Sequence, residues 1–86
     1  MVSVVTMLQN AEYDFCLDAT GLKCPLPVLK ARRQIAAMDS GSILMVLADD
    51  PSAPLDFEHF CEVGGHVMLE QSEDEHGLIT FRIRKG

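Results

Sequence analysis

The sequence predicts an α+β fold of two layers, in which a mixed four-stranded sheet carries both helices on one face. Three observations predict it. The segments follow the order strand, helix, strand, helix, strand, strand. A strand–helix–strand crossover is almost always right-handed, so the first two strands should be parallel. Apolar and polar residues alternate in the first and last strands, which leaves one sheet face in water and places both helices on the other.

The first strand is expected over residues 13–18, where apolar and polar residues alternate. This alternation predicts that Tyr13, Phe15 and Leu17 point toward the core. A loop follows, over residues 19–23.

The first helix is expected from Pro25 to about Met38, because apolar residues recur there at helical spacing. It should end near residues 39–41, where Gly41 can adopt the left-handed conformation of a helix cap. The continuous apolar run over residues 42–48, bounded by turn residues, is the best candidate for a central strand.

The second helix should start at Ser52, an N-capping residue, with Pro54 tolerated in its first turn. Gly64 and Gly65 should end it. The last two strands are expected at 66–72 and 78–84, joined by a turn that contains a glycine. The inward positions of the last strand are Ile79, Phe81 and Ile83.

Length and composition indicate a small globular protein. Of the 86 residues, we assign 1–10 to a flexible leader and 11–86 to a single domain. The chain has no secretory signal and no apolar run of the ~18 residues that span a membrane, which favours the cytoplasm. The net charge of −6 argues against direct nucleic-acid binding.

The three cysteines, Cys16, Cys24 and Cys61, have no C-x-x-C spacing. They therefore predict neither a disulfide framework nor a zinc site, and we expect no metal and no cofactor. Cys61 shares a helix face with Phe57 and Phe60, which indicates a core position. Cys16 alternates onto the polar face of its strand, where it could form a disulfide with Cys24, although an incidental strand cysteine is the simpler interpretation.

Cys24 is the candidate reactive residue, because it stands where the first helix should begin. Pro25 and Pro27 fit a first helical turn, whose N–H groups have no partner inside the helix. A residue before proline is held away from helical angles, so Cys24 should be the N-cap. The helix N-terminus and the neighbouring Lys23 should favour its thiolate.

Basic residues gather around this cysteine in an otherwise acidic chain. Lys23, Lys30, Arg32 and Arg33 lie within eleven positions of one another. Such a local positive patch suits an acidic protein partner or an anionic sulfur species.

The stretch LDATGLKCPLPVLKARR resembles the TusA/SirA family of small sulfur carriers, which are defined by a Cys-Pro-x-Pro motif at the start of the first helix. Here the motif is Cys24-Pro25-Leu26-Pro27. The resemblance extends from about residue 13 to 85 and includes ADDPSAPLDFEHFCEVGGHVML, similar to the second-helix region of the family.

This resemblance implies the same β-α-β-α-β-β fold and a sulfur-carrier function. Cys24 would carry a persulfide received from a cysteine desulfurase and pass it to an acceptor in tRNA thiolation, molybdenum-cofactor synthesis or other sulfur metabolism. Pro25 and Pro27 would set the geometry of the thiol, and we infer that Lys30, Arg32 and Arg33 dock a partner. A free monomer is expected.

Two other hypotheses remain open from the residues alone. One is a thiol redox or regulatory module in which Cys24 forms mixed disulfides, although the missing C-x-x-C pair weakens it. The other is a structural adaptor that uses only the basic patch.

Overall fold

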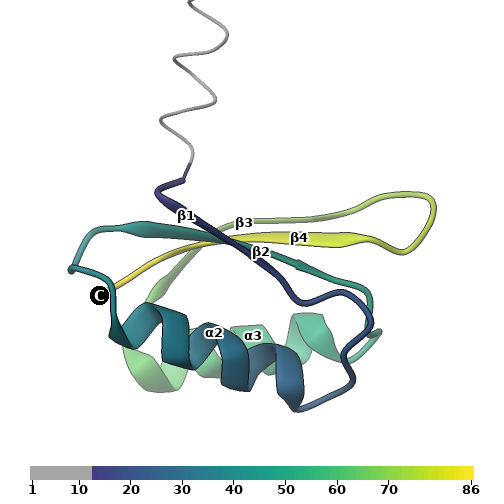
Figure 1. Ribbon diagram of the computed structural model, residues 1–86, viewed down its shortest axis with the longest axis horizontal. Coiled ribbons are helices and arrows are strands. Elements are labelled where there is room, and N and C mark those ends of the chain that lie inside the picture. Colours follow the sequence, from purple (N-terminus) through teal and green to yellow (C-terminus); the bar gives the residue numbers. More distant parts are fainter. Residues whose placement is uncertain (1–12) are drawn as a thin grey trace, which may run out of the picture.

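The computed structural model describes residues 13–86, so the predicted leader at 1–10 lies outside the described part of the chain. Six elements follow one another in the predicted order (Figure 1). They are β1 (Phe15–Asp18), α2 (Leu26–Ala36), β2 (Ile43–Ala48), α3 (Ala53–Gly64), β3 (Val67–Glu73) and β4 (Ile79–Arg84).

The strands form one mixed sheet in the order β1-β2-β4-β3. β1 and β2 are parallel, as the crossover rule predicted, and the pairs β2–β4 and β3–β4 are antiparallel. The apolar run of β2 lies centrally in this sheet, between β1 and β4. The carboxyl ends of the parallel strands β1 and β2 therefore lie at the same end of the sheet, and the loops to α2 and α3 start there.

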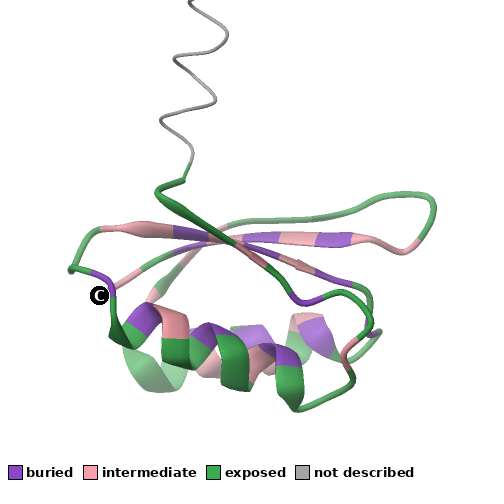
Figure 2. Cartoon of the chain, viewed as in Figure 1, coloured by how far each residue is buried: buried purple, intermediate pink, exposed green. Residues whose placement is uncertain are grey.

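Both helices cover one face of the sheet, which confirms the predicted two-layer architecture (Figure 1). The core lies between the layers, where alternate residues of β2 and β4 meet one face of each helix (Figure 2). At its centre Phe57 of α3 packs against Phe81 of β4, with ring centroids 4.6 Å apart. Cys61 is buried beside them, as its helix face predicted.

The predicted ends of α3 are confirmed, with one difference at the start. Ser52 occupies the N-cap and Pro54 the first turn, but the Ser52 side chain makes no capping hydrogen bond. Gly65 ends the helix in the left-handed conformation, with φ of 74°.

The first helix is shorter than predicted at both ends. Pro25 is the N-cap of α2, so the helix begins at Leu26, and it ends at Ala36. Gly41 does adopt a positive φ, but it lies in the turn before β2 and does not cap the helix. Met38, beyond the helix, is still buried in the core.

Tyr13 and Phe15, which the alternation places on the core side of the first strand, are not buried in the core. Their exposed fractions are 38% and 43%, respectively. Phe15 does lie on the helix side of the sheet, because it pairs with the buried Leu44. β1 is an edge strand, however, and the helices cover the central strands more completely, so only Leu17 of this strand packs against the core.

Among residues 13–86, no helix has both the length and the apolar character needed to cross a bilayer.

Candidate functional site

Cys24 lies in the turn between β1 and α2, one residue before the N-cap Pro25. The prediction that Cys24 is itself the cap is therefore wrong by one position. The turn is closed by the Leu26 N–H, which donates to the Lys23 carbonyl at 2.8 Å. Pro27 is buried within the first turn of α2. The motif thus fixes the helix start while Cys24 stays exposed.

The loop that joins β2 to α3 holds the Cys24 loop through its backbone. The Cys24 N–H donates to Oδ2 of Asp50 at 2.6 Å. The Gly21 N–H donates to both carboxylate oxygens of the neighbouring Asp49, at 3.0 and 3.1 Å. Asp50 is only 7% exposed, so its hydrogen bond is shielded from water. Two acidic residues of one loop therefore position the backbone of the other loop.

Carboxylates also dominate the electrostatics of the thiol. The Cys24 thiol donates a hydrogen bond to Asp56, in the first turn of α3, and this bond raises the pKa of Cys24. Partial desolvation and the negative charges of Asp56 and Asp50 raise that pKa further. The prediction that Lys23 and the helix N-terminus lower it is therefore wrong in direction. These contacts favour the protonated thiol, with the Asp56 carboxylate as the acceptor of its hydrogen bond.

The other two cysteines lie in different environments. Cys61 is buried, and burial raises its pKa to about 11. Cys16 is exposed as predicted and pairs in register with Met45, so its side chain is on the sheet face away from the helices. All three are free thiols. Neither of the other cysteines shares the hydrogen-bonded loop of Cys24.

The predicted basic residues do not form one patch. Lys30 and Arg33 line a groove of about 520 Å³ between β1 and α2, whereas Arg32 lines a second groove of about 370 Å³ between α2 and α3. Lys23 lies in the loop before Cys24. α2 thus presents its positive charges on two sides, with Arg33 in its last turn, at the end away from Cys24.

Within the described residues, no group of three or more His, Cys, Asp or Glu side chains is arranged to hold a metal ion.

Sequence reasoning missed the role of the acidic residues around Cys24. The sequence places Asp49 and Asp50 in a loop at a strand end, where they could hold a partner or a proton, but it does not connect them with Cys24 and does not single out Asp56. One signal could have found them. Loops that follow parallel neighbouring strands leave the same sheet edge, so the Asp49–Asp50 pair had to lie near the Cys24 loop.

Fold and site together define a small two-layer α/β protein that presents one hydrogen-bonded, exposed cysteine at the start of a helix. A family model described as sulfurtransferase TusA matches residues 16–85. The chain belongs to this TusA family of sulfur carriers.

Individual relatives agree with this assignment. A protein of Neisseria meningitidis serogroup A is 52% identical over 68 residues, which cover 79% of this chain and 90% of the relative. The sulfur carrier protein TusA of Allochromatium vinosum is 44% identical over 75 residues, covering 87% and 97% of the two chains. The crystal structure of a SirA-like protein from Desulfitobacterium hafniense superposes with a TM-score of 0.75 at 28% identity, covering 85% of this chain and 99% of that one.

Proposed function

We propose that Cys24 carries sulfur as a persulfide, receiving it from a cysteine desulfurase and passing it to an acceptor protein. The observation that carries the proposal is the exposed Cys24, whose backbone N–H is bonded to Asp50 and whose thiol is hydrogen-bonded to Asp56. Family membership supports sulfur as the cargo.

The transfer needs no net oxidation. The Cys24 sulfur attacks the terminal sulfur of a donor persulfide, a new S–S bond forms at Cys24, and the S–S bond of the donor breaks. The Cys24 proton passes to Asp56 and from there to the departing donor thiolate. Release to the acceptor repeats the same exchange with Cys24 as the leaving group.

The surroundings of the thiol suit this exchange. Cys24 stays protonated until Asp56 accepts its proton, which limits its reaction with unrelated electrophiles. Pro25 and Pro27 begin α2 immediately after it, so the sulfur projects from a fixed backbone. Lys23 precedes Cys24 in the same loop, where its charge would attract an anionic sulfur species to the motif.

The partner-docking roles belong to Lys30, Arg32 and Arg33, which flank the helix that starts at the motif. Suitable acceptors include proteins of tRNA thiolation and of molybdenum-cofactor or other sulfur metabolism. The redox-module hypothesis has less support, because Cys16 lies on the sheet face away from the helices and Cys61 is buried.

The test is an intact-mass measurement after incubation with a cysteine desulfurase and cysteine. The wild-type protein should gain one sulfur atom, which a reductant removes. Cys24→Ser should gain none, whereas the matched control Cys16→Ser should load normally. Failure of the wild-type protein to gain sulfur would overturn the proposal and favour a redox or adaptor role.

A further inference from the structure

The groove between β1 and α2 has the properties of a peptide-binding surface. We propose that it binds an extended segment of a partner protein, which pairs with the free edge of β1 and carries acidic and apolar side chains. That this partner belongs to the sulfur relay rests on the proposed function, whereas the binding itself does not.

The floor and rim of the groove are mainly apolar. Leu17 of β1 and Leu26, Leu29 and Ala37 on the helix side line it. Leu26 and Leu29 are each 47% exposed, although they are large hydrophobic residues in the first turns of a helix. Phe15 adds a further exposed ring, on the same face of β1 as Leu17. An apolar surface spread over two elements in this way is typical of an interaction site.

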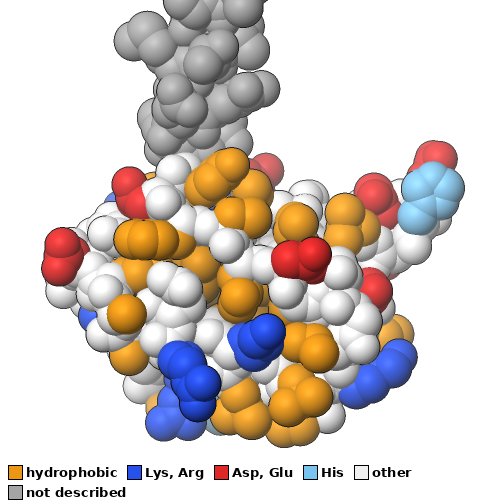
Figure 3. Space-filling model, viewed as in Figure 1, with side chains coloured by type: hydrophobic (Ala, Val, Ile, Leu, Met, Phe, Trp, Pro, Cys, Tyr) orange, Lys and Arg blue, Asp and Glu red, His pale blue; other side chains and the backbone are white. Residues whose placement is uncertain are grey.

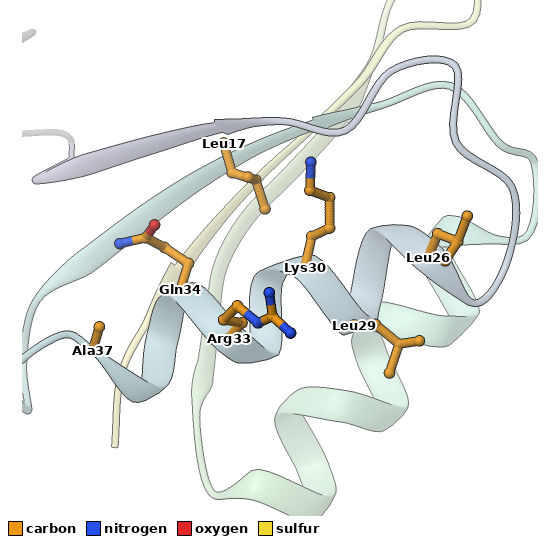
Figure 4. A pocket seen from close by; sticks show the side chains of 7 residues that line it. All are labelled: Leu17, Leu26, Leu29, Lys30, Arg33, Gln34 and Ala37. Carbon is orange, nitrogen blue, oxygen red and sulfur yellow. The ribbon is translucent and has the colours of Figure 1, made fainter.

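Positive charge lies across this apolar surface. Leu17 extends from β1 toward α2, and Lys30 extends from α2 toward β1 (Figure 4). The face that shows β1 and α2 has blue basic side chains between orange hydrophobic ones (Figure 3). No acidic residue is among the described residues lining the groove. Within residues 13–86, Lys30 and Arg33 form no salt bridge. Hydrogen bonds from Thr20 and, to a smaller extent, the charge of Lys30 lower the pKa of Asp18 on β1. A carboxylate of a partner would therefore share Lys30 with Asp18 and would pair with Arg33.

The second groove does not have this character. Asp56 and His59 line it together with Arg32, so it carries charges of both signs. An acidic segment would therefore be repelled there by Asp56, which also holds the Cys24 thiol. Charge complementarity thus favours the β1–α2 groove.

The edge of the sheet explains why the segment should be extended. In the described part of the chain β1 pairs only with β2, so its other edge has no strand partner. A strand added at such an edge gains backbone hydrogen bonds. Its alternate side chains, about 7 Å apart, would face the helix side. Those positions would meet Leu17 and Leu29 with apolar groups and Lys30 and Arg33 with carboxylates.

This position also brings the partner to the reactive thiol. The groove begins at Leu26, two residues after Cys24, and follows α2 to Ala37. A partner held there by one segment has its remaining surface next to the motif, which raises the local concentration of its own thiol.

The experiment is a selection of random twelve-residue peptides, displayed on phage, against the folded wild-type protein. The enriched peptides should be acidic with apolar residues at alternate positions. Their affinities are then measured by fluorescence anisotropy. The double variant Lys30→Glu/Arg33→Glu should bind them about tenfold or more weakly, because two charge-assisted contacts are lost. The matched control Arg84→Glu should stay within about twofold, because Arg84 is exposed on β4 and alternates onto the sheet face away from the helices.

Amide chemical shifts then locate the bound peptide and should move at residues 15–18 and along α2. The proposal is overturned if no peptide is enriched, if the double variant and Arg84→Glu bind equally well, or if the shifts map to the α2–α3 groove. A second copy of this chain as the occupant would appear as self-association without peptide, and this would also overturn it. Circular dichroism of each variant checks that the exposed substitutions leave the fold intact.

Loading of Cys24 with sodium polysulfide, read by intact mass, tests the carrier thiol without any protein partner. If loading fails while peptides bind, the proposed carrier function is wrong and peptide binding in the β1–α2 groove is supported. If loading succeeds while no peptide binds, the proposal that the β1–α2 groove binds a peptide is wrong and the carrier function is supported.

Discussion

At the scale of single residues, two aspartates hold Cys24 in different ways. Asp50 accepts a hydrogen bond from its backbone N–H and Asp56 accepts one from its thiol. The hydrogen bond to Asp50 fixes the backbone of Cys24, and the hydrogen bond to Asp56 orients its thiol proton. A thiol controlled in this manner reacts when its proton can leave, whereas a permanently ionised thiolate would react with any electrophile.

Replacing Asp56 with Asn is expected to lower the pKa of Cys24. The hydrogen bond and the charge of this carboxylate both raise that pKa, and Asn removes the charge. At neutral pH the variant should therefore hold more thiolate and react faster with iodoacetamide. The rate of Cys24 alkylation, followed by mass spectrometry across a pH series in the Cys16→Ser background, measures the shift.

The matched control for this change is Glu58→Gln, which removes an exposed carboxylate from the same helix. It should leave the pH profile of Cys24 unchanged. An unchanged or raised pKa of Cys24 in the Asp56 variant would contradict the assigned role of Asp56.

At the scale of elements, the strand–helix joints carry the site. The loop after β1 presents Cys24, the loop after β2 presents Asp50, and α3 adds Asp56 in its first turn. Cys24 lies more than 20 positions from either aspartate in sequence, yet the three residues meet because β1 and β2 are parallel neighbours. The motif itself supplies only the thiol and the two prolines.

We expect Asp50→Ala to lower the free energy of unfolding by roughly 1.5–3 kcal/mol, the usual cost of losing a hydrogen bond to a charged group. Asp50 is buried and also accepts a bond from the Ser52 N–H at 3.3 Å. Without it, the Cys24 N–H loses its acceptor. Urea unfolding followed by circular dichroism measures the change.

Asp49→Ala is the comparison for this substitution. Asp49 binds the same loop through Gly21 but is exposed, so its loss should cost less than about 1 kcal/mol. Equal effects of the two variants would show that burial of Asp50 does not strengthen its bond.

At the scale of the whole molecule, the sequence predicts the fold more completely than it predicts the site. The unbroken apolar run of β2 and the alternation of β4 identify a central pair of strands. Strands buried on both faces have continuous apolar residues, and strands buried on one face alternate between apolar and polar residues. Phe15 shows the limit, since its alternation gives the correct face but not whether a helix covers it. The pKa of Cys24 depends on residues brought together by folding, which local reasoning about a helix N-terminus could not include.

The labelling rate of the buried Cys61 thiol measures how often the whole structure unfolds. Its side chain is 5% exposed and burial raises its pKa to about 11, so the folded protein offers almost no reactive thiolate at that position. In native buffer iodoacetamide should therefore label Cys16 and Cys24, while Cys61 reacts only in molecules that have unfolded. For a stability of about 5 kcal/mol, its labelling should be slower than that of an exposed thiol by roughly 10³-fold or more.

Peptide mapping of the labelled protein over time separates the three rates, and labelling in concentrated urea should make them similar. Asp50→Ala supplies an internal check, because each loss of about 1.4 kcal/mol in stability should speed the labelling of Cys61 tenfold. Fast native labelling of Cys61 would mean that α3 leaves the sheet without global unfolding. In that case the carboxylate of Asp56 could not stay fixed beside Cys24. Asp56 and Cys61 both lie on α3, and α3 is held to the sheet by the packing of Phe57 against Phe81.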